Sequence, residues 1–207
     1  MPAMAPTRSE ASQAKPRRAD AERSIAQILD AAVDALASDP EASMAEIARR
    51  AGVVRATIYV HYATREALLE AVTDRVMREA HDAIQSAEPE RGDPSEALRR
   101  VVTTAWRTVG RYHALVEVNT RLPHDELRQR HRPVFDALEP LIRRGQRQGA
   151  FRSDVPPGWH VAMAIALMHA ASGELRARRV SKQKVEAALV EAILGAVGTP
   201  RSAPPRP

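Results

Sequence analysis

The sequence predicts an all-α protein of about nine helices, with a small three-helix N-terminal unit followed by a larger helical domain. Three observations lead to this fold class. Apolar residues recur at the i, i+3, i+4 and i+7 spacing of a helix face along most of the chain. Helix-capping residues precede several of these segments. No segment shows the alternation expected of a half-buried strand, and no internal repeat is visible.

The composition is that of a globular protein with loose ends. Of the 207 residues, 44% are hydrophobic and 28% are charged, and both ends of the chain are rich in proline. We expect a flexible basic arm over residues 1–19 and a flexible Pro-rich tail over 199–207. The absence of cysteine excludes disulfides, thiol nucleophiles and cysteine-based metal sites.

Charge and hydropathy bear on the partner and the compartment. The net charge is +5, and because the only lysines are Lys15, Lys182 and Lys184, nearly all of the positive charge is arginine. Arginine suits bidentate contacts with phosphate, so a nucleic-acid partner is permitted. The longest apolar run, 161–168, is shorter than the roughly 20 residues of a membrane span. The N-terminus has no apolar run typical of a signal peptide, so we expect a cytoplasmic protein with no membrane partner.

The first four helices are predicted from apolar spacing and caps. Positions 25, 28, 29, 32, 33 and 36 share one side of a helix that begins near Asp20. Ser43 and Glu46 form a capping box at the start of a second helix, which Gly52 ends. A third short helix follows over 54–61. Thr64 then caps a long fourth helix that reaches about residue 86.

The C-terminal helices are predicted in the same way. Asp93, Pro94 and Glu96 have the pattern of a capped helix start, and this fifth helix carries apolar residues as far as 112. The later helices are expected over 124–130, 134–148, 159–178 and 183–197. The third of these is apolar almost all round, and the last carries an apolar stripe from Val185 to Val197.

The second and third helices have the outline of a helix-turn-helix, in which one helix braces and the next enters the major groove of DNA. With Ile58 pointing inward and about 100° per residue, Ala56 and Val60 point outward and Thr57 and Tyr59 lie on the flanks. Small outward residues let the backbone approach base edges, and Val60 is suited to touch a thymine methyl group. Residues 43–66 carry four arginines against two glutamates, a net charge of +2 that attracts phosphates.

Residues 47–69 read IARRAGVVRATIYVHYATREALL, and they resemble the DNA-binding signature of TetR-family transcriptional regulators. The resemblance implies a helix-turn-helix DNA-binding domain over 20–81. It implies phosphate contacts from Tyr59 and Arg65, groove contacts from Arg55, Ala56, Thr57 and His61, and a cap near the DNA backbone from Ser43. Val54 stands where the family commonly has Ser or Thr, so the third helix lacks its usual N-cap.

Residues 82–198 resemble that family in architecture alone, which implies an effector-binding and dimerisation domain. The last two helices would form a homodimer interface that buries the stripe from Val185 to Val197 and the apolar 159–171 segment, whereas a monomer would leave the stripe exposed. Two recognition helices about 34 Å apart would then meet a palindromic operator in double-stranded DNA.

Eight residues are candidates for lining a small-molecule effector pocket in this domain. They are Trp106, Val109, Tyr112, His113, Asn119, Phe135, Met163 and His169. The helical spacing of Trp106, Val109, Phe135 and Met163 favours plain core packing. The polar residues His113, Asn119 and His169 fit satisfied core hydrogen bonds as well as they fit ligand contacts.

We therefore expect a ligand-responsive, homodimeric transcriptional repressor that a small molecule releases from its operator. The alternative is an effector-independent helical DNA-binding protein with an architectural role. No acid, base and nucleophile set can be assembled, so an enzyme is not expected. No histidine pair has a carboxylate partner suited to zinc, and no glycine motif for phosphates is present, so we expect no metal and no cofactor.

Overall fold

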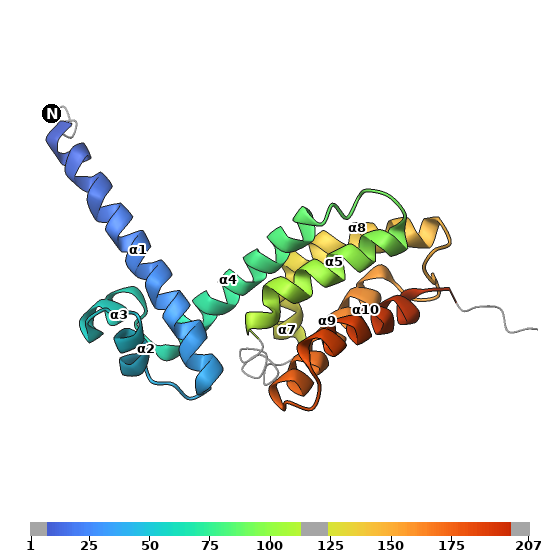
Figure 1. The fold of residues 1–207 in the computed structure, drawn as a ribbon. Coiled ribbons are helices and arrows are strands. Elements are labelled where there is room, and N and C mark those ends of the chain that lie inside the picture. The colour runs from blue at the N-terminus through green and yellow to red at the C-terminus, as the bar shows by residue number, and fades with distance from the viewer. Residues whose placement is uncertain (1–7, 113–123, 200–207) are drawn as a thin grey trace, which may run out of the picture. The chain divides into compact units, whose positions relative to one another are not determined.

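A computed structural model describes residues 8–112 and 124–199 of the chain. Within these residues the fold is all-α, as predicted, with nine α-helices, one 3-10 turn and a single β-bridge between Phe151 and Gly198 (Figure 1). The chain divides into two compact units inside one helix, after Val72. The boundary expected after residue 81 falls in the same helix. No helix among the described residues is long and apolar enough to cross a bilayer.

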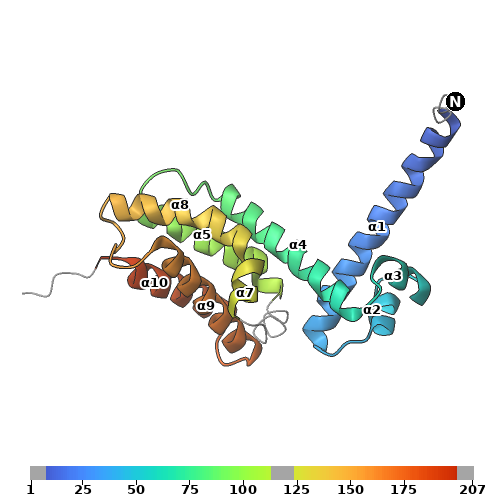
Figure 2. The same cartoon turned by 180° about the vertical axis from the view of Figure 1, so that it is seen from behind.

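The N-terminal unit packs short helices around one long one. Its elements are α1 (Arg8–Ser38), α2 (Met44–Arg50), α3 (Arg55–His61) and the start of α4 (Arg65–Ser86). Figure 2 shows α2 and α3 beside α1, and α2 packs against both other helices. The core comes from apolar residues spaced along one face of each helix, which are Ile28, Ala32, Leu36, Ile47, Ile58, Leu68 and Val72.

Helix α1 begins at Arg8, well before the start expected near Asp20. The segment 8–19, predicted to be part of a flexible arm, is helical. Its sequence is dominated by Ala, Glu, Gln, Lys and Arg, which have high helix propensity but form no apolar stripe. A prediction based on apolar spacing misses such a helix, because it depends on the residues that the helix buries.

Three predicted caps are present in the structure. The Ser43 hydroxyl accepts a hydrogen bond from the Glu46 amide at 3.2 Å, and the Thr64 hydroxyl accepts one from the Ala67 amide at 3.1 Å. Asp93 accepts from the Ser95 and Glu96 amides at 2.8 and 3.2 Å. Each cap satisfies backbone N–H groups that a helix start would leave unpaired.

Helix α3 lacks such a cap, which leads to a stability prediction. Val54 occupies the N-cap position with φ −70° and ψ 149°, makes no side-chain cap bond and is 70% exposed. Threonine has nearly the same shape and adds an acceptor, so Val54→Thr should raise the free energy of unfolding by roughly 0.5–1 kcal/mol. Urea unfolding measures the change. Val60→Thr, the same exchange within α3, serves as the control, and an equal gain there would contradict the cap explanation.

The C-terminal unit is a bundle formed by the rest of α4 and the later helices. These are α5 (Pro94–Val109), the 3-10 turn η1 (Gly110–Tyr112), α7 (His124–Arg130), α8 (Arg132–Arg147), α9 (Pro157–Arg176) and α10 (Lys182–Val197). Helix α8 packs against α5 and α9, and α10 packs against the same two helices (Figure 1). The core therefore joins consecutive helices and also helices far apart in sequence, since α5 packs against both α8 and α10.

Two arginines fix the connection between α4 and α5. Arg100 donates to the carbonyls of Ala87, Glu88 and Arg91 at 2.9 to 3.3 Å. Arg144 on α8 donates to the Pro89 and Gly92 carbonyls at 2.8 and 2.6 Å. The loop is thus held by hydrogen bonds to α5 and α8, which fixes the C-terminal end of α4 against the bundle.

The expectation that a monomer exposes the α10 stripe is wrong. Val185, Leu189, Ile193 and Val197 are all 5% exposed or less within the single chain, because α5 and α9 cover them. Ion pairs strengthen this packing, since Arg99 and Arg107 on α5 pair with Glu191 and Glu186 on α10 at 2.7 and 2.6 Å. The exposed residues of α10 are small or polar, namely Lys182, Gln183, Lys184, Ala187, Ala188, Glu191, Ala192 and Gly195.

Within the single chain, the apolar segment of α9 has a buried side and an exposed side. Val161 and Ala164 are buried in the bundle, whereas Ala166 and Ala170 are exposed. Trp159, at the start of the helix, keeps 51% of its surface exposed. A helix that is apolar all round gives no sign in the sequence of which face its own chain covers.

Candidate nucleic-acid interface and interior cavity

The turn between α2 and α3 is tight and depends on glycine. Gly52 has φ +68°, a left-handed conformation that other residues rarely adopt. The Val53 amide donates to the Ala48 carbonyl at 3.1 Å, and the Gly52 amide donates to the Arg49 carbonyl at 3.3 Å. These bonds satisfy the last carbonyls of α2 and set the direction in which α3 leaves.

Helix α3 has one buried anchor and an open outer face. Ile58 is fully buried, whereas Val60 is 80% exposed and Tyr59 is 40% exposed. Ala56 is exposed as well, and Thr57 is half-buried at the edge of the face. We name this surface, made of Arg55, Ala56, Thr57, Tyr59, Val60 and His61, the α3 face. Its orientation agrees with the helical geometry predicted from the sequence.

The arginines around this face are not equally available. The Arg55 guanidinium lies over the Tyr59 ring, 5.6 Å from its centroid, on the exposed side of α3. Arg49 and Arg50 both donate to the Glu46 carboxylate at 2.7 to 2.8 Å. These hydrogen bonds lower the pKa of Glu46 to about 2, so this carboxylate stays ionised and the three residues carry a net charge of +1.

The Arg65 guanidinium, for which a phosphate contact is predicted, binds two backbone carbonyls of its own unit. Its guanidinium donates to the Pro40 carbonyl at 2.6 Å and to the Ala42 carbonyl at 3.3 Å. It therefore ties the start of α4 to the loop that precedes α2. The nitrogen atoms that bind these carbonyls are directed into the protein, so a phosphate contact would use the remaining N–H groups.

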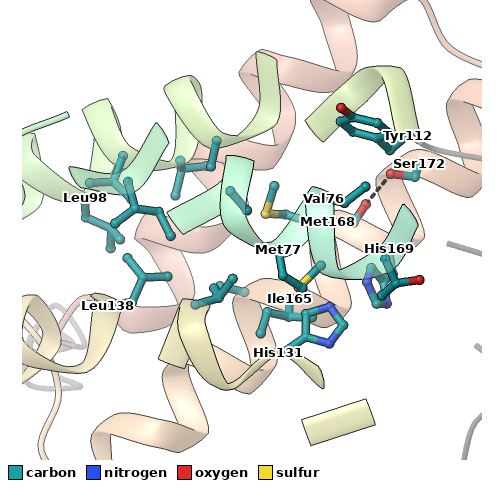
Figure 3. Close-up of a pocket in the computed structure, with 18 residues that line it drawn as sticks. Val76, Met77, Leu98, Tyr112, His131, Leu138, Ile165, Met168, His169 and Ser172 are labelled. Atoms are coloured by element: carbon teal, nitrogen blue, oxygen red, sulfur yellow. Dashed lines mark hydrogen bonds between the residues drawn. The ribbon is translucent and has the colours of Figure 1, made fainter. Parts of the chain in front are cut away.

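A cavity of about 100 Å³ lies inside the C-terminal unit. Helices α4, α5, α8 and α9 and the turn η1 supply its walls, and most of the lining side chains are aliphatic or methionine. Figure 3 shows Leu98 and Leu138 at one end and Tyr112, His131, His169 and Ser172 toward the other. The cavity is thus apolar with a more polar end.

Hydrogen bonds and ring contacts organise the polar end. The rings of His131 and His169 meet edge to face with centroids 5.4 Å apart. The Ser172 hydroxyl donates to the Met168 carbonyl at 2.9 Å. The Tyr112 hydroxyl donates to Glu79 at 2.5 Å, and Arg75 donates to the same carboxylate at 3.0 Å.

Burial changes the protonation of one cavity histidine. Desolvation, reinforced by the neighbouring His131, lowers the pKa of His169 from 6.5 to about 4. His169 is therefore uncharged near neutral pH.

The lowered pKa of His169 predicts a pH-dependent stability. Because the unfolded chain takes up the proton near 6.5 and the folded protein only near 4, the contribution of His169 is full above pH 6.5 and falls as the pH drops toward 4. Between pH 7.5 and 4.5, the wild type should lose about 2 kcal/mol more unfolding free energy than His169→Gln. Urea titrations at the two pH values measure this difference. Equal losses in both proteins would contradict the burial of a neutral imidazole.

The cavity contains two of the eight predicted effector residues. Tyr112 and His169 line it. Trp106 is buried in the core without lining the cavity, and Met163 is half-buried on α9 outside it. The Phe135 ring is also buried outside the cavity, where the Arg128 guanidinium lies 4.4 Å from its centroid. Trp106 and Phe135 thus belong to the core, whereas Met163 does not.

The other three candidates are not placed. His113 and Asn119 lie outside the described residues, and Val109 ends α5 with its side chain outside the described part. The sequence reasoning also missed residues that line the cavity, including Thr73, Met77, His131, Met168 and Ser172. A buried stripe on α4 was visible in the sequence. It did not indicate which members would face an empty space rather than a neighbouring side chain.

Helix α3 follows a glycine turn, is anchored by one buried isoleucine and carries small and polar residues on its outer face. A helix with these features can enter the major groove of DNA. The fold and this face together define a DNA-binding protein of the helix-turn-helix class. The family model described as "Bacterial regulatory proteins, tetR family" matches residues 28–72, which include the α3 face. Together with the relatives described next, this match shows that the chain belongs to the TetR family of transcriptional regulators.

Several known proteins are similar over most of this chain. The HTH-type transcriptional repressor LfrR of Mycolicibacterium smegmatis is 31% identical over 181 residues, 87% of this chain and 94% of LfrR. The HTH-type transcriptional regulator NfxB of Pseudomonas aeruginosa is 28% identical over 159 residues, 75% of this chain and 84% of NfxB. The nucleoid occlusion factor SlmA of Marinobacter nauticus is 29% identical over 136 residues, 63% of this chain and 70% of SlmA.

The fold is shared with a solved structure of one of these relatives. The structure of LfrR in complex with proflavine matches with a TM-score of 0.66 and 29% identity, covering 86% of this chain and 98% of that one. The protein is accordingly a DNA-binding transcriptional regulator and not an enzyme.

Proposed function

We propose that the protein is a cytoplasmic homodimeric repressor that binds a palindromic operator through the α3 face and leaves it when a small molecule fills the cavity. The observation that carries the proposal is the α3 face, where Val60 is 80% exposed beside the fully buried Ile58. Ile58 anchors α3 in its own unit, and the apolar Val60 side chain is left exposed on the outer face. Such a side chain is suited to contact a base edge in the major groove. The resemblance to the repressor LfrR supports repression as the outcome.

Dimerisation supplies the second recognition helix of a palindrome. The outward face of α9 is a candidate for the interface, because Trp159, Ala166 and Ala170 are exposed and lie about one to two helical turns apart. Small outward residues on α10 permit close approach of a second copy in the same region. Trp159, Ala166 and Ala170 would supply apolar contacts to such an interface, as expected of a stable homodimer.

Release by an effector is supported by the composition of the cavity wall. Thr73, Val76, Met77, Ala80 and Ile84 all line the cavity from α4, and the same helix begins at Arg65 in the N-terminal unit. A ligand that binds better when α4 is displaced shifts the population of the regulator away from its DNA-binding state. The ligand must distinguish the two states, since equal affinity for both would leave DNA binding unchanged.

The test is to select bound fragments from a genomic library with the full-length protein and then to screen small molecules for their release. Sedimentation of the protein on the selected DNA gives the stoichiometry. We expect two chains on an inverted repeat, and a compound that lowers affinity for it. Recovery of random fragments only would contradict sequence-specific regulation.

A second candidate is an effector-independent DNA-binding protein with an architectural role, and the similarity to the nucleoid occlusion factor SlmA favours it. The cavity of about 100 Å³ is also small compared with common ligand sites of roughly 300–1,000 Å³. In this case no compound would release the DNA, and the selected fragments would carry many sites across the chromosome rather than a few operators.

Phosphate contacts by Tyr59 and Arg65 lead to a prediction on salt dependence. Tyr59→Phe and Arg65→Ala should weaken binding to operator and random duplexes alike, and Arg65→Ala should flatten the slope of log affinity against log salt by about 1. Arg65→Lys is the matched control, because it keeps the charge but cannot hold both the Pro40 and Ala42 carbonyls in the same geometry. A full loss of affinity in Arg65→Lys with an unchanged salt slope would show that Arg65 acts through the loop instead of a phosphate.

A further inference from the structure

We propose that the cavity in the C-terminal unit takes a compact, uncharged and largely apolar molecule, of one or two fused rings, whose single polar group meets the histidine end. This inference rests on the proposed function, in which the cavity is the effector site. It names the chemical class of the effector, and it differs from the kind of ligand that the LfrR structure holds, the dye proflavine.

The described part of the wall has no acidic side chain and no Lys or Arg. Among the eighteen lining residues that the structure describes, only the two histidines can gain a charge near neutral pH. The lining histidine His169 is neutral near pH 7, because burial holds its pKa near 4. An ion entering such a space gives up its hydration without gaining a counter-charge, which costs far more than burying a neutral ring of the same size.

One carboxylate behind the wall, that of Glu79, is already engaged. Glu79 accepts the Tyr112 hydroxyl at 2.5 Å and the Arg75 guanidinium at 3.0 Å. The Arg75 charge balances that of Glu79, and Tyr112 stands between this pair and the cavity, since Tyr112 is the member that lines it. Neither a cation nor an anion in the cavity therefore finds an uncompensated partner in this pair.

The two ends of the cavity differ in polarity. Leu98 and Leu138 lie at one end in Figure 3, and the His131 and His169 rings lie toward the other. An imidazole offers one donor and one acceptor nitrogen when neutral, so this end is suited to a hydroxyl, carbonyl or ring N–H of the ligand. An amphipathic neutral molecule, apolar with one polar edge, matches this arrangement.

The volume limits the size of the ligand. An engineered apolar cavity of about 150 Å³ in another protein holds benzene. A cavity of about 100 Å³ therefore accepts a single ring with little adjustment. Met77 and Met168 line it, and because methionine side chains rearrange readily, a second fused ring is accessible by their movement.

The experiment uses three probes of the same ring size and different charge: 2-naphthol, 2-naphthoate and 2-naphthylmethylammonium. Isothermal titration of the full-length protein at pH 7.5 should give an affinity for 2-naphthol at least tenfold higher than for either ion. Ala164→Leu fills the cavity from α9, and should lower the 2-naphthol affinity at least tenfold. Ala45→Leu, the same exchange at an exposed position of α2, should leave it unchanged.

Thermal unfolding of each variant shows that it is folded, and Ala80→Leu on α4 fills the same cavity from a second wall if Ala164→Leu does not fold. The inference is overturned if 2-naphthol does not bind, if either ion binds as tightly, or if the filled variants bind like the wild type. If proflavine releases operator DNA and 2-naphthol does not bind, the inferred class of effector is wrong and the proposed repressor function stands. If 2-naphthol binds but does not release the DNA, the inferred ligand class stands and the proposed release of DNA by the effector is wrong.

Discussion

Replacing Val60 by aspartate should reduce operator affinity by about 100-fold or more while leaving the protein folded. Val60 is 80% exposed, so the new carboxylate is solvated in the free protein and costs little there. In the complex it would face base edges flanked by phosphates, where it is repelled and loses its water. Gel-shift or fluorescence anisotropy titration on the selected operator measures the loss.

A matched control separates this local effect from a change in net charge. Gln85→Asp adds the same charge at an exposed position near the C-terminal end of α4. It should change operator affinity by no more than a few-fold. Comparable losses in the two variants would show that overall charge, rather than the α3 face, determines binding.

Replacing Gly145 by alanine should destabilise the protein by about 3 kcal/mol, although the same exchange within a helix usually stabilises. A Cβ at position 145 would overlap the Phe151 ring, which is 2% exposed and so lies among other protein atoms. The Ala150 and Phe151 amides also donate to the Gly145 carbonyl at 2.9 and 3.2 Å, so the backbone cannot shift without breaking these bonds. Chemical unfolding measures the effect.

A double-mutant cycle tests the cause of this loss. Phe151→Leu alone should cost about 1–2 kcal/mol by leaving a cavity. In the double variant Gly145→Ala/Phe151→Leu, the smaller side chain removes the overlap, so the combined cost should be at least about 1 kcal/mol below the sum of the single costs. Additive costs would mean that the glycine is needed for a reason other than the ring.

Local signals made much of the fold predictable. Ser43, Thr64 and Asp93 have short polar side chains ahead of apolar periods, and each makes its cap bond in the structure. Gly52 was predicted to end α2, and its positive φ requires a residue without a Cβ. Once Ile58 is taken as the inward residue, helical geometry alone gives the outward direction of Ala56 and Val60. These features depend on residues within a few positions of one another.

The features that were missed depend on long-range packing. The hydrogen bonds from Arg65 to the Pro40 and Ala42 carbonyls were not predicted, because these carbonyls belong to a loop more than twenty residues earlier. The α10 stripe is buried by α5 and α9 of the same chain, and its periodicity is the same whether its partner is internal or a second subunit. His131 starts α8 and lines the cavity, but a single histidine between two arginine-rich segments carries no pattern.

The central claim, that the α3 face sits in the major groove of duplex DNA twice per dimer, is tested most directly by methylation protection of the selected operator. Dimethyl sulfate reacts with guanine N7 in the major groove and with adenine N3 in the minor groove. We predict that the protein protects guanine N7 in two patches whose centres lie about one helical turn, or a multiple of it, apart, and that Val60→Asp loses this protection. Protection of adenine N3 alone, with every guanine N7 still reactive, would contradict the account.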